Sequence, residues 1–190
     1  MIDKLIAYDE KLFLFLNNLG SSTWDPFWMF YTTKFYWIPF YGVLLFLFFK
    51  KYQRNAFFLT VVLIIAMVAF TDQVTNIFKD SFMRFRPCHN PDFIDVMRRV
   101  KSECGGLYGY FSGHASNSMA VAVFTGLTLK YKYKNLIFLL LLWAALMGYS
   151  RIYIGVHYPL DVLCGMTFGA LSGFGFYKLQ NYLHNRYKLL

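Results

Sequence analysis

Five long apolar runs, each bounded by Lys or Arg, constrain the fold of this chain more than any other feature. They cover about residues 26–49, 56–78, 115–129, 135–150 and 159–177. No run has 18 uninterrupted apolar residues, the strict criterion for a spanning helix, but together they leave little sequence for a water-facing surface. They also lack the polar faces at helical spacing that a soluble helical bundle needs. The sequence therefore predicts an all-α, polytopic membrane bundle with about five transmembrane helices.

The composition agrees with lipid as the solvent around much of the chain. Of its 190 residues, 57% are hydrophobic, 22% are aromatic and only 15% are charged, against about 25% charged residues in typical soluble domains. The net charge of +9 does not indicate nucleic acid, because the basic residues form short clusters between apolar runs, as at membrane flanks. We expect a bilayer around the chain, no nucleic acid, and no obligate protein partner.

Residues 1–22 precede the first apolar run and differ from it in pattern. An apolar stripe at helical spacing accompanies a separate polar cluster of Asp3, Lys4, Asp9, Glu10 and Lys11. The segment is too short and too charged to cross a bilayer, so the pattern predicts an amphipathic helix along the membrane interface. No signal peptide is recognisable here, and residues 1–190 are expected to form a single domain.

The connecting loops predict the orientation of the chain. Basic clusters at 50–54, 130–134 and 178–188 fall on one side by helix parity, which the positive-inside rule makes cytoplasmic. Loops 79–114 and 150–158 then share the opposite, outer face. We expect a bacterial cytoplasmic (inner) membrane and an active site that faces the periplasm or cell exterior. The long outer loop is itself basic against this rule, and an anionic ligand would explain the exception.

Side chains suited to phosphate chemistry gather on that outer face. Lys79 and Arg86 begin the long loop, Ser112, Gly113 and His114 close it, and Arg151, His157 and Asp161 surround the start of the last apolar run. Arg and Lys suit a tetrahedral dianion, while a Ser-Gly turn before a helix offers a hydroxyl and free N–H groups. Pro159 favours a helix start near residue 158, which puts Asp161 about one turn from His157, where a carboxylate can fix the imidazole tautomer.

Each of these residues also has an ordinary alternative role. Lys79 and Arg86 can be interfacial anchors, His114 a capped loop histidine, and His157 and Asp161 a buried pair that caps a helix. These alternatives do not explain why all the residues fall on one membrane face, and the phosphate interpretation does.

The three motifs, in order and spacing, resemble one known family. Lys79-x6-Arg86-Pro87, then Ser112-Gly113-His114, then Ser150-Arg151-x5-His157-x3-Asp161 is similar to the type 2 phosphatidic acid phosphatase superfamily. That group includes membrane lipid phosphatases, soluble bacterial acid phosphatases, glucose-6-phosphatase and the vanadium haloperoxidases. The resemblance runs from Lys79 to Asp161. One departure is Phe111, which stands where the family usually has Pro.

The resemblance implies a role for each residue of the motifs. His157 would be the nucleophile that forms a phosphohistidine, Asp161 would orient it, and His114 would act as acid and then as base. The phosphoryl oxygens would be held by Lys79, Arg86, Ser112, Gly113 and Arg151. No cofactor is implied. Two histidines and an aspartate can hold a metal, but three nearby cations would repel one, so we expect a metal-independent lipid phosphatase.

The substrate is less constrained than the reaction. Undecaprenyl pyrophosphate is slightly favoured on family breadth alone, with phosphatidylglycerol phosphate, phosphatidic acid and lipid A phosphates as alternatives. The basic loop residues suggested for headgroup selection are Arg84, Arg98, Arg99 and Lys101. Other functions with the same residues are a lipid or anion transporter, a non-catalytic receptor or scaffold, a soluble phosphatase and a haloperoxidase.

The cysteines and glycines carry two smaller predictions. Cys88 and Cys104 share the long loop and would form a disulfide in an oxidising compartment, closing a ring of about 16 residues worth roughly 3 kcal/mol; two free thiols are the alternative. Cys164 is expected to pack in an apolar run. Gly165, Gly169 and Gly173 have the small-xxx-small spacing of close helix contacts, which we expect to be intramolecular rather than dimeric.

Overall fold

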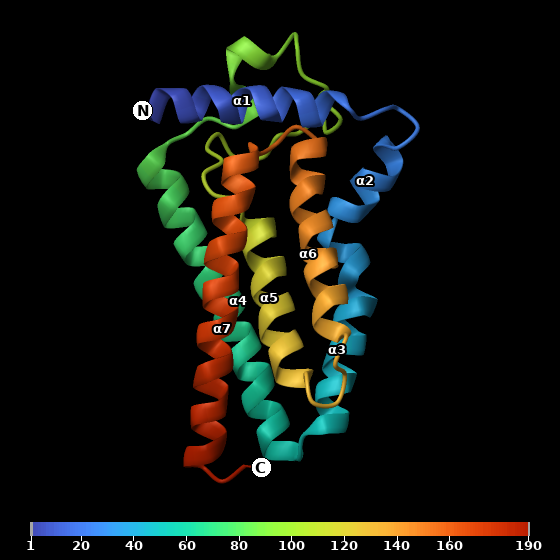
Figure 1. The fold of residues 1–190 in the computed structure, drawn as a ribbon, viewed down its shortest axis with the longest axis vertical. Coiled ribbons are helices and arrows are strands. Elements are labelled where there is room, and N and C mark those ends of the chain that lie inside the picture. The colour runs from blue at the N-terminus through green and yellow to red at the C-terminus, as the bar shows by residue number, and fades with distance from the viewer. Residues whose placement is uncertain (1, 190) are drawn as a thin grey trace.

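The computed structural model describes residues 2–189. The chain folds into an upright helical bundle with one helix lying across its end (Figure 1). No strand occurs among these residues, so the all-α prediction is confirmed. The helices are α1 (Ile2–Asn18), α2 (Asp25–Thr32), α3 (Ile38–Lys51), α4 (Arg54–Phe82), α5 (Gly113–Leu129), α6 (Leu136–Tyr153) and α7 (Pro159–Arg186). Short 3-10 turns cover Lys34–Trp37, Pro87–His89 and Pro91–Phe93.

Every predicted apolar run is helical in the structure. Helices α4, α6 and α7 are long and apolar enough to cross a membrane. The first run is bent, because α2 and the segment Lys34–Lys51 meet at 67°, as in a broken span or a re-entrant loop. Helix α5 has 17 residues, one short of the 18 that the criterion asks for, and it lies in the middle of the bundle (Figure 1). The chain is thus an integral membrane protein.

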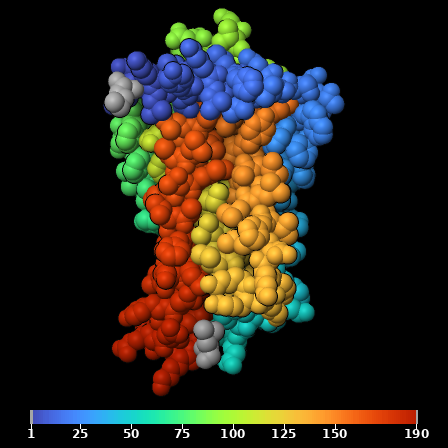
Figure 2. Space-filling model, in the orientation of Figure 1, coloured from blue at the N-terminus to red at the C-terminus, as the bar shows by residue number. Residues whose placement is uncertain are grey.

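Glycines bring the backbones of α5 and α7 into direct contact. A Cβ atom on Gly165, Gly169 or Gly173 would overlap a main-chain carbonyl oxygen of α5 or of its N-cap. The predicted glycine stripe therefore packs within the molecule, as expected. The two helices approach so closely that α5 shows at the surface in Figure 2 only as a narrow strip between α6 and α7.

Helix α1 lies across the ends of α6 and α7 (Figures 1 and 2). The face that it turns toward the bundle carries Asp9, Phe13 and Asn17, which are all buried. The Phe13 ring packs edge-on against Tyr158, with centroids 5.4 Å apart, and the Asn17 amide donates to the carbonyl oxygens of Ile152 and Arg98. The sequence had grouped Asp9 with the polar residues of this helix, and its burial was not expected.

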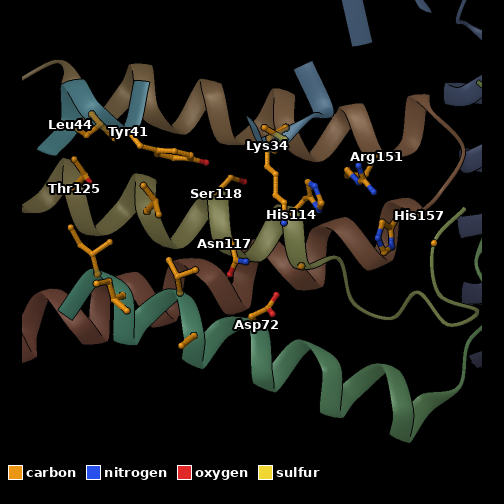
Figure 3. Close-up of a pocket in the computed structure, with 18 of the residues that line it drawn as sticks. Lys34, Tyr41, Leu44, Asp72, His114, Asn117, Ser118, Thr125, Arg151 and His157 are labelled. Atoms are coloured by element: carbon orange, nitrogen blue, oxygen red, sulfur yellow. The ribbon is translucent and has the colours of Figure 1, made fainter. Parts of the chain in front are cut away.

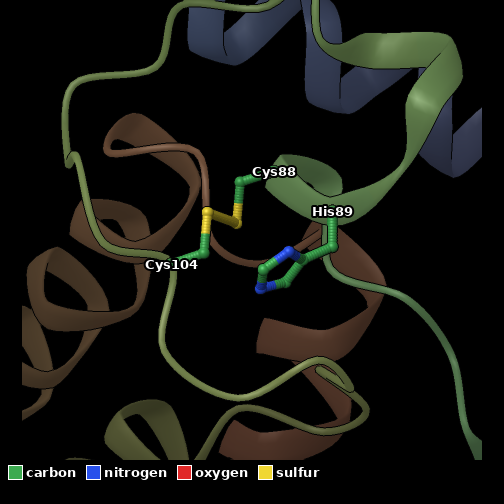
Figure 4. Close-up of side chains that lie close together, drawn as sticks. All are labelled: Cys88, His89 and Cys104. Carbon is green, nitrogen blue, oxygen red and sulfur yellow. A yellow bond between two sulfur atoms is a disulfide. The ribbon is translucent and has the colours of Figure 1, made fainter.

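The loop between α4 and α5 is held to itself and to the bundle. The backbone N–H groups of Arg86 and Gly109 donate to the carbonyl oxygens of Leu107 and Arg84, so that the two ends of the loop run side by side. Cys88 and Cys104 are joined by a disulfide, with Cα atoms 6.1 Å apart (Figure 4). These links fix the loop above the N-terminal ends of α5 and α7.

Candidate active site

A cavity of about 880 Å³ lies between α3, α4, α5 and the long loop. Six of the eight residues predicted for catalysis or phosphate binding line it, namely Lys79, Arg86, Gly113, His114, Arg151 and His157. They come from helices α4, α5 and α6 and from two loops, and Figure 3 shows His157, Arg151 and His114 at one end of the cavity. Ser112 and Asp161 do not line it and lie behind the other residues.

His157 is held in the short connection between α6 and α7. Gly155 has a φ of +83°, a backbone angle that glycine adopts without strain, and it turns the chain out of α6. The imidazole is only 2% exposed. Its Nε2 atom lies 3.5 Å from Arg86 Nη1, while Nδ1 faces Asp161 Oδ2 at 3.5 Å. The two ring nitrogens therefore have different surroundings, with Nε2 on the side of the cations.

The charge around His157 favours its neutral form. Burial lowers the pKa of His157 well below its usual range, and the positive charges of Arg86, Arg151 and Lys79 act in the same direction. A neutral imidazole has a free lone pair on one nitrogen, which is what a nucleophile requires.

Asp161 is bound more closely to other partners than to His157. Its Oδ1 atom accepts from Arg84 Nη1 at 2.9 Å, and its Oδ2 atom accepts from the Tyr158 N–H at 3.0 Å. The 3.5 Å separation from His157 Nδ1 exceeds the usual hydrogen-bond range of about 2.7–3.2 Å. The carboxylate is thus in place to orient His157 after a small movement, and until then it caps the start of α7.

Two arginines give the polar end of the cavity its charge. Arg86 donates through Nε to the Tyr108 carbonyl at 3.2 Å, which leaves its other nitrogens directed at His157. Arg151 donates from Nη1 to the Thr32 hydroxyl, and its buried Nε has no hydrogen-bond partner among the described residues. A buried donor without a partner is costly, and a bound anion would satisfy it.

Lys79 and the first turn of α5 line the same cavity as these arginines. A Cβ atom placed on Gly113 would come within 3.9 Å of Lys79 Nζ, so the ammonium group stands beside the N–H groups at the start of α5. Ser112 is the N-cap of this helix, and its buried hydroxyl accepts from the Ala115 N–H at 3.5 Å. Its backbone N–H donates to the Asp161 carbonyl, which ties the start of α5 to that of α7.

The structure adds polar residues to the cavity that the motifs did not predict. Among them are Lys34, Asp72, Asn117 and Ser118, and in Figure 3 the Lys34 side chain extends toward His114. The sequence held a signal for two of them, because Lys34 and Asp72 interrupt apolar runs, and ionisable residues within spans commonly mark a functional site.

Only one of the four basic loop residues suggested for headgroup selection lines the cavity, and it is Lys101. Arg98 instead pairs with Asp25, Arg99 donates to the Ser102 carbonyl, and Arg84 lies between Asp9 and Asp161. Their positive charge is therefore used within the loop and at its contacts with α1, α2 and α7.

The opposite end of the cavity is apolar. It runs between α3 and α4 and is lined by Leu44, Leu45, Phe48, Ile64, Ile65 and Val68. Figure 3 shows this part extending along the helices away from His157 and Arg151. A ligand that fills the whole cavity would need an anionic group at one end and an apolar chain at the other.

Phe111 occupies the position where the resemblance leads one to expect Pro. Its ring is buried and packs between Phe78 of α4 and Phe168 of α7, with centroids 5.1 and 5.2 Å away. The aromatic ring thus anchors the end of the long loop in the bundle directly before Ser112.

Among the described residues, one group of side chains has the spacing of metal ligands, and it contains neither His114 nor His157. It consists of Cys88, His89 and Cys104. Both sulfur atoms belong to the disulfide (Figure 4), so neither is a thiolate, the form of cysteine that binds metals.

One buried and one half-buried histidine, a carboxylate and a cluster of cations lie at one end of a helical membrane bundle. This is the arrangement expected of a membrane protein that binds and processes an anionic group. A family model described as the PAP2 superfamily matches residues 57–185, and the chain belongs to this superfamily, as a membrane phosphatase.

Individual relatives agree with this assignment. The chain is 33% identical to a lipid A 4'-phosphatase of Porphyromonas gingivalis over 98% of its own length and 78% of the relative. It is 29% identical to an undecaprenyl-diphosphatase of Sulfolobus acidocaldarius over 89% of this chain and 77% of that one. The structure of a transmembrane PAP2-type phosphatidylglycerolphosphate phosphatase from Bacillus subtilis superposes with a TM-score of 0.75 at 20% identity, covering 94% of this chain and 87% of the other.

Proposed function

We propose that this protein hydrolyses the phosphate of a membrane lipid through a phosphohistidine at His157. The observation that carries the proposal is the shape of the cavity: His157 Nε2 faces the cations at one end, and apolar side chains of α3 and α4 line the other. A lipid phosphate has the same division, with a dianion joined to hydrocarbon. The cavity can hold the headgroup while the tails remain in the bilayer.

In the first step, Nε2 of neutral His157 attacks the phosphorus. A P–N bond forms as the bond to the leaving lipid oxygen breaks, and His114 donates a proton to that oxygen. Lys79, Arg86, Arg151 and the hydroxyl and N–H groups of Ser112 and Gly113 hold the three remaining oxygens. Preorganised positive charge of this kind offsets the charge that spreads over them in the transition state.

In the second step, water replaces the lipid. His114, now neutral, accepts a proton from a water molecule whose oxygen attacks the phosphorus, and the P–N bond breaks to release inorganic phosphate. Asp161 stabilises the positive charge that His157 carries while it is phosphorylated. The residues supply an acid, a base and a nucleophile between them, and we propose that the reaction needs no metal ion.

Lipid A phosphate is the substrate that we propose first. The relative from P. gingivalis, a lipid A 4'-phosphatase, supports this choice, because it shares 33% identity over nearly the whole chain. Undecaprenyl pyrophosphate, which the sequence alone favoured slightly, is the second candidate and has the support of the 29% identical undecaprenyl-diphosphatase. The additional cations Lys34 and Lys101 in the cavity would suit the second phosphate of that lipid.

We further propose that the cation end of the cavity faces the periplasm or cell exterior of a bacterial cytoplasmic membrane. The basic clusters at 50–54 and 130–134 lie at the opposite ends of the helices, where the positive-inside rule expects the cytoplasm. The disulfide of the outer loop also suits an oxidising compartment.

Phosphate release from purified protein in detergent tests the proposal. Wild type would be incubated with EDTA and a panel of lipid A, undecaprenyl pyrophosphate, phosphatidylglycerol phosphate and phosphatidic acid. His157→Ala would run beside His89→Ala, which removes a histidine that does not line the cavity. We expect turnover by wild type and His89→Ala, and none by His157→Ala. Turnover by His157→Ala at the wild-type rate, or no turnover of any lipid by wild type, would refute the proposed reaction.

A further inference from the structure

A chain of charged side chains connects helix α1 to the candidate active site. Asp9 of α1 accepts through Oδ2 from Arg84 Nη2 at 2.7 Å, and Arg84 Nη1 donates to Asp161 Oδ1 at 2.9 Å. One guanidinium thus bridges a carboxylate of α1 and the carboxylate beside His157. Asp9 is only 6% exposed and Asp161 is fully buried, so solvent screens this chain weakly.

Asp9 contacts the start of α7 in a second way. Its Oδ1 atom accepts from the Leu160 N–H at 2.7 Å, one of the N–H groups that a helix start leaves without a partner inside the helix. Both oxygens of Asp9 are therefore engaged next to the turn that carries His157. Arg84 is fixed from a third side, because its guanidinium lies over the Tyr158 ring at 4.0 Å from the centroid.

The second carboxylate changes what Arg84 does to Asp161. An arginine paired with Asp161 alone would neutralise its carboxylate. A phosphorylated or protonated His157 would then lack the negative charge that stabilises it. Arg84 shares its positive charge between two carboxylates instead, so the three side chains carry a net negative charge toward His157. The fork geometry of the guanidinium also fixes the direction of the Asp161 carboxylate.

We propose that Asp9 is a positioning residue for the reaction at His157, and that it acts through Arg84 on Asp161. The surface helix α1 is then part of the catalytic apparatus as well as an interfacial element. This inference rests on the proposed function, since it assigns Asp9 a part in the same phosphoryl transfer. None of the three motifs contains Asp9 or Arg84 as a defined position.

Asp9→Asn tests the proposal, because it keeps the size of the side chain and removes its charge. In metal sites, losing a partner that orients a ligand costs about 10–100-fold, so we expect kcat to fall at least about tenfold. KM should change little, since the cations that hold the phosphate remain. Glu10→Gln is the matched control, because it removes the same charge one residue along α1 and should leave both constants at their wild-type values.

A double-mutant cycle separates action through Arg84 from a general effect of α1. Coupled residues give non-additive effects, so adding Asp9→Asn to Arg84→Gln should lower kcat no further. Asn17→Ala loosens α1 at its other end, and should lower the melting temperature without the fall in kcat. Independent, multiplicative losses for Asp9→Asn and Arg84→Gln would overturn the inference, as would equal losses for Asp9→Asn and Asn17→Ala.

A measurement without turnover distinguishes failure of this inference from failure of the proposed function. Protein labelled with 15N-histidine would be examined by NMR in detergent, with the His157 signals assigned from His157→Ala. Asp9→Asn should shift the His157 ring signals, and Glu10→Gln should not. Unshifted His157 signals in Asp9→Asn would refute the link even if wild type hydrolyses lipid. Shifted His157 signals in Asp9→Asn, together with a wild type that hydrolyses no lipid, would support the link and refute only the proposed reaction.

Discussion

Gly109 offers a direct test of how tightly the site is packed. An alanine Cβ at this position would stand 3.0 Å from Arg86 Cγ, and 3.4 Å from both His157 Nδ1 and Asp161 Oδ2. Carbon atoms normally approach to about 3.5–4.0 Å, so Arg86 or the loop must move by about 0.5 Å. The φ of Gly109 lies outside the left-handed region, so the backbone itself accepts alanine and the effect comes from contact alone.

The expected magnitude follows from that displacement. A misplacement of about 1 Å near reacting atoms costs roughly 10²-fold in rate, so about 0.5 Å on the same logarithmic scale costs about tenfold. We therefore expect Gly109→Ala to lower kcat/KM by about tenfold, measured as phosphate release from the lipid that wild type hydrolyses best. The melting temperature, measured in the same detergent, should change little because the contact is local.

Gly106→Ala is the matched control for this prediction. Gly106 lies in the same loop, and a Cβ placed on it meets no atom within 4 Å. Its kcat/KM should equal that of wild type. The reasoning would be wrong if Gly109→Ala were as active as Gly106→Ala, since the loop would then yield without disturbing Arg86 or His157.

Three further predictions concern stability. Burial, together with the positive charges of Arg86, Arg151 and Lys79, holds the pKa of His157 well below its usual range. Below about pH 6.5 the unfolded chain therefore binds a proton that the folded chain does not bind, so stability should fall by up to about 1.4 kcal/mol for each pH unit lowered. Unfolding of wild type and His157→Gln between about pH 8 and pH 5 checks this, and equal slopes would contradict it. Gly169→Ala forces a Cβ atom into the α5 backbone and should lower the free energy of unfolding by about 1–3 kcal/mol, seen as a lower melting temperature. In Gly175→Ala, on the same helix, the added Cβ meets no atom within 4 Å, and the melting temperature should not fall. Cys88→Ser breaks the disulfide to Cys104 and should lower the free energy of unfolding by roughly 3 kcal/mol, an effect that a reducing agent should reproduce in wild type only.

Much of the fold was predictable because it depends on local patterns. The apolar runs gave the helices of the bundle, and Pro159 marked the first residue of α7. The glycine spacing along α7 predicted its close contact with another helix, although not that the partner is α5. A spacing rule shows which face of a helix carries small residues, but it does not show which helix packs against that face.

The gathering of the motif residues was predictable from the sequence, and the contacts between distant segments were not. Lys79, Arg86, His114 and His157 line one cavity as the helix order indicated. Asp9 lies 75 residues from Arg84, and nothing in the pattern of α1 says which of its polar residues will be buried. The role of Ser112 as a helix cap was equally unpredictable. A serine before a helix gives the same sequence pattern whether its hydroxyl faces a ligand or the backbone.

The close contact of α5 with α7 supports the two histidines in a way that the apolar lining of the cavity does not share. His114 stands at the start of α5 and His157 just before α7, so the backbone contacts at Gly165 and Gly169 fix the two histidines relative to each other. The apolar lining from α3 has no comparable glycine contact, since a Cβ atom on Gly42 would meet no atom within 4 Å. The segment Lys34–Lys51 also meets α2 at a bend of 67°. Substitutions in α3 and α4 can therefore fit the cavity to a different lipid chain, while the distance between the two histidines stays the same. On the proposed function, the part of the molecule that carries out the reaction is thus separate from the part that contacts the lipid chain.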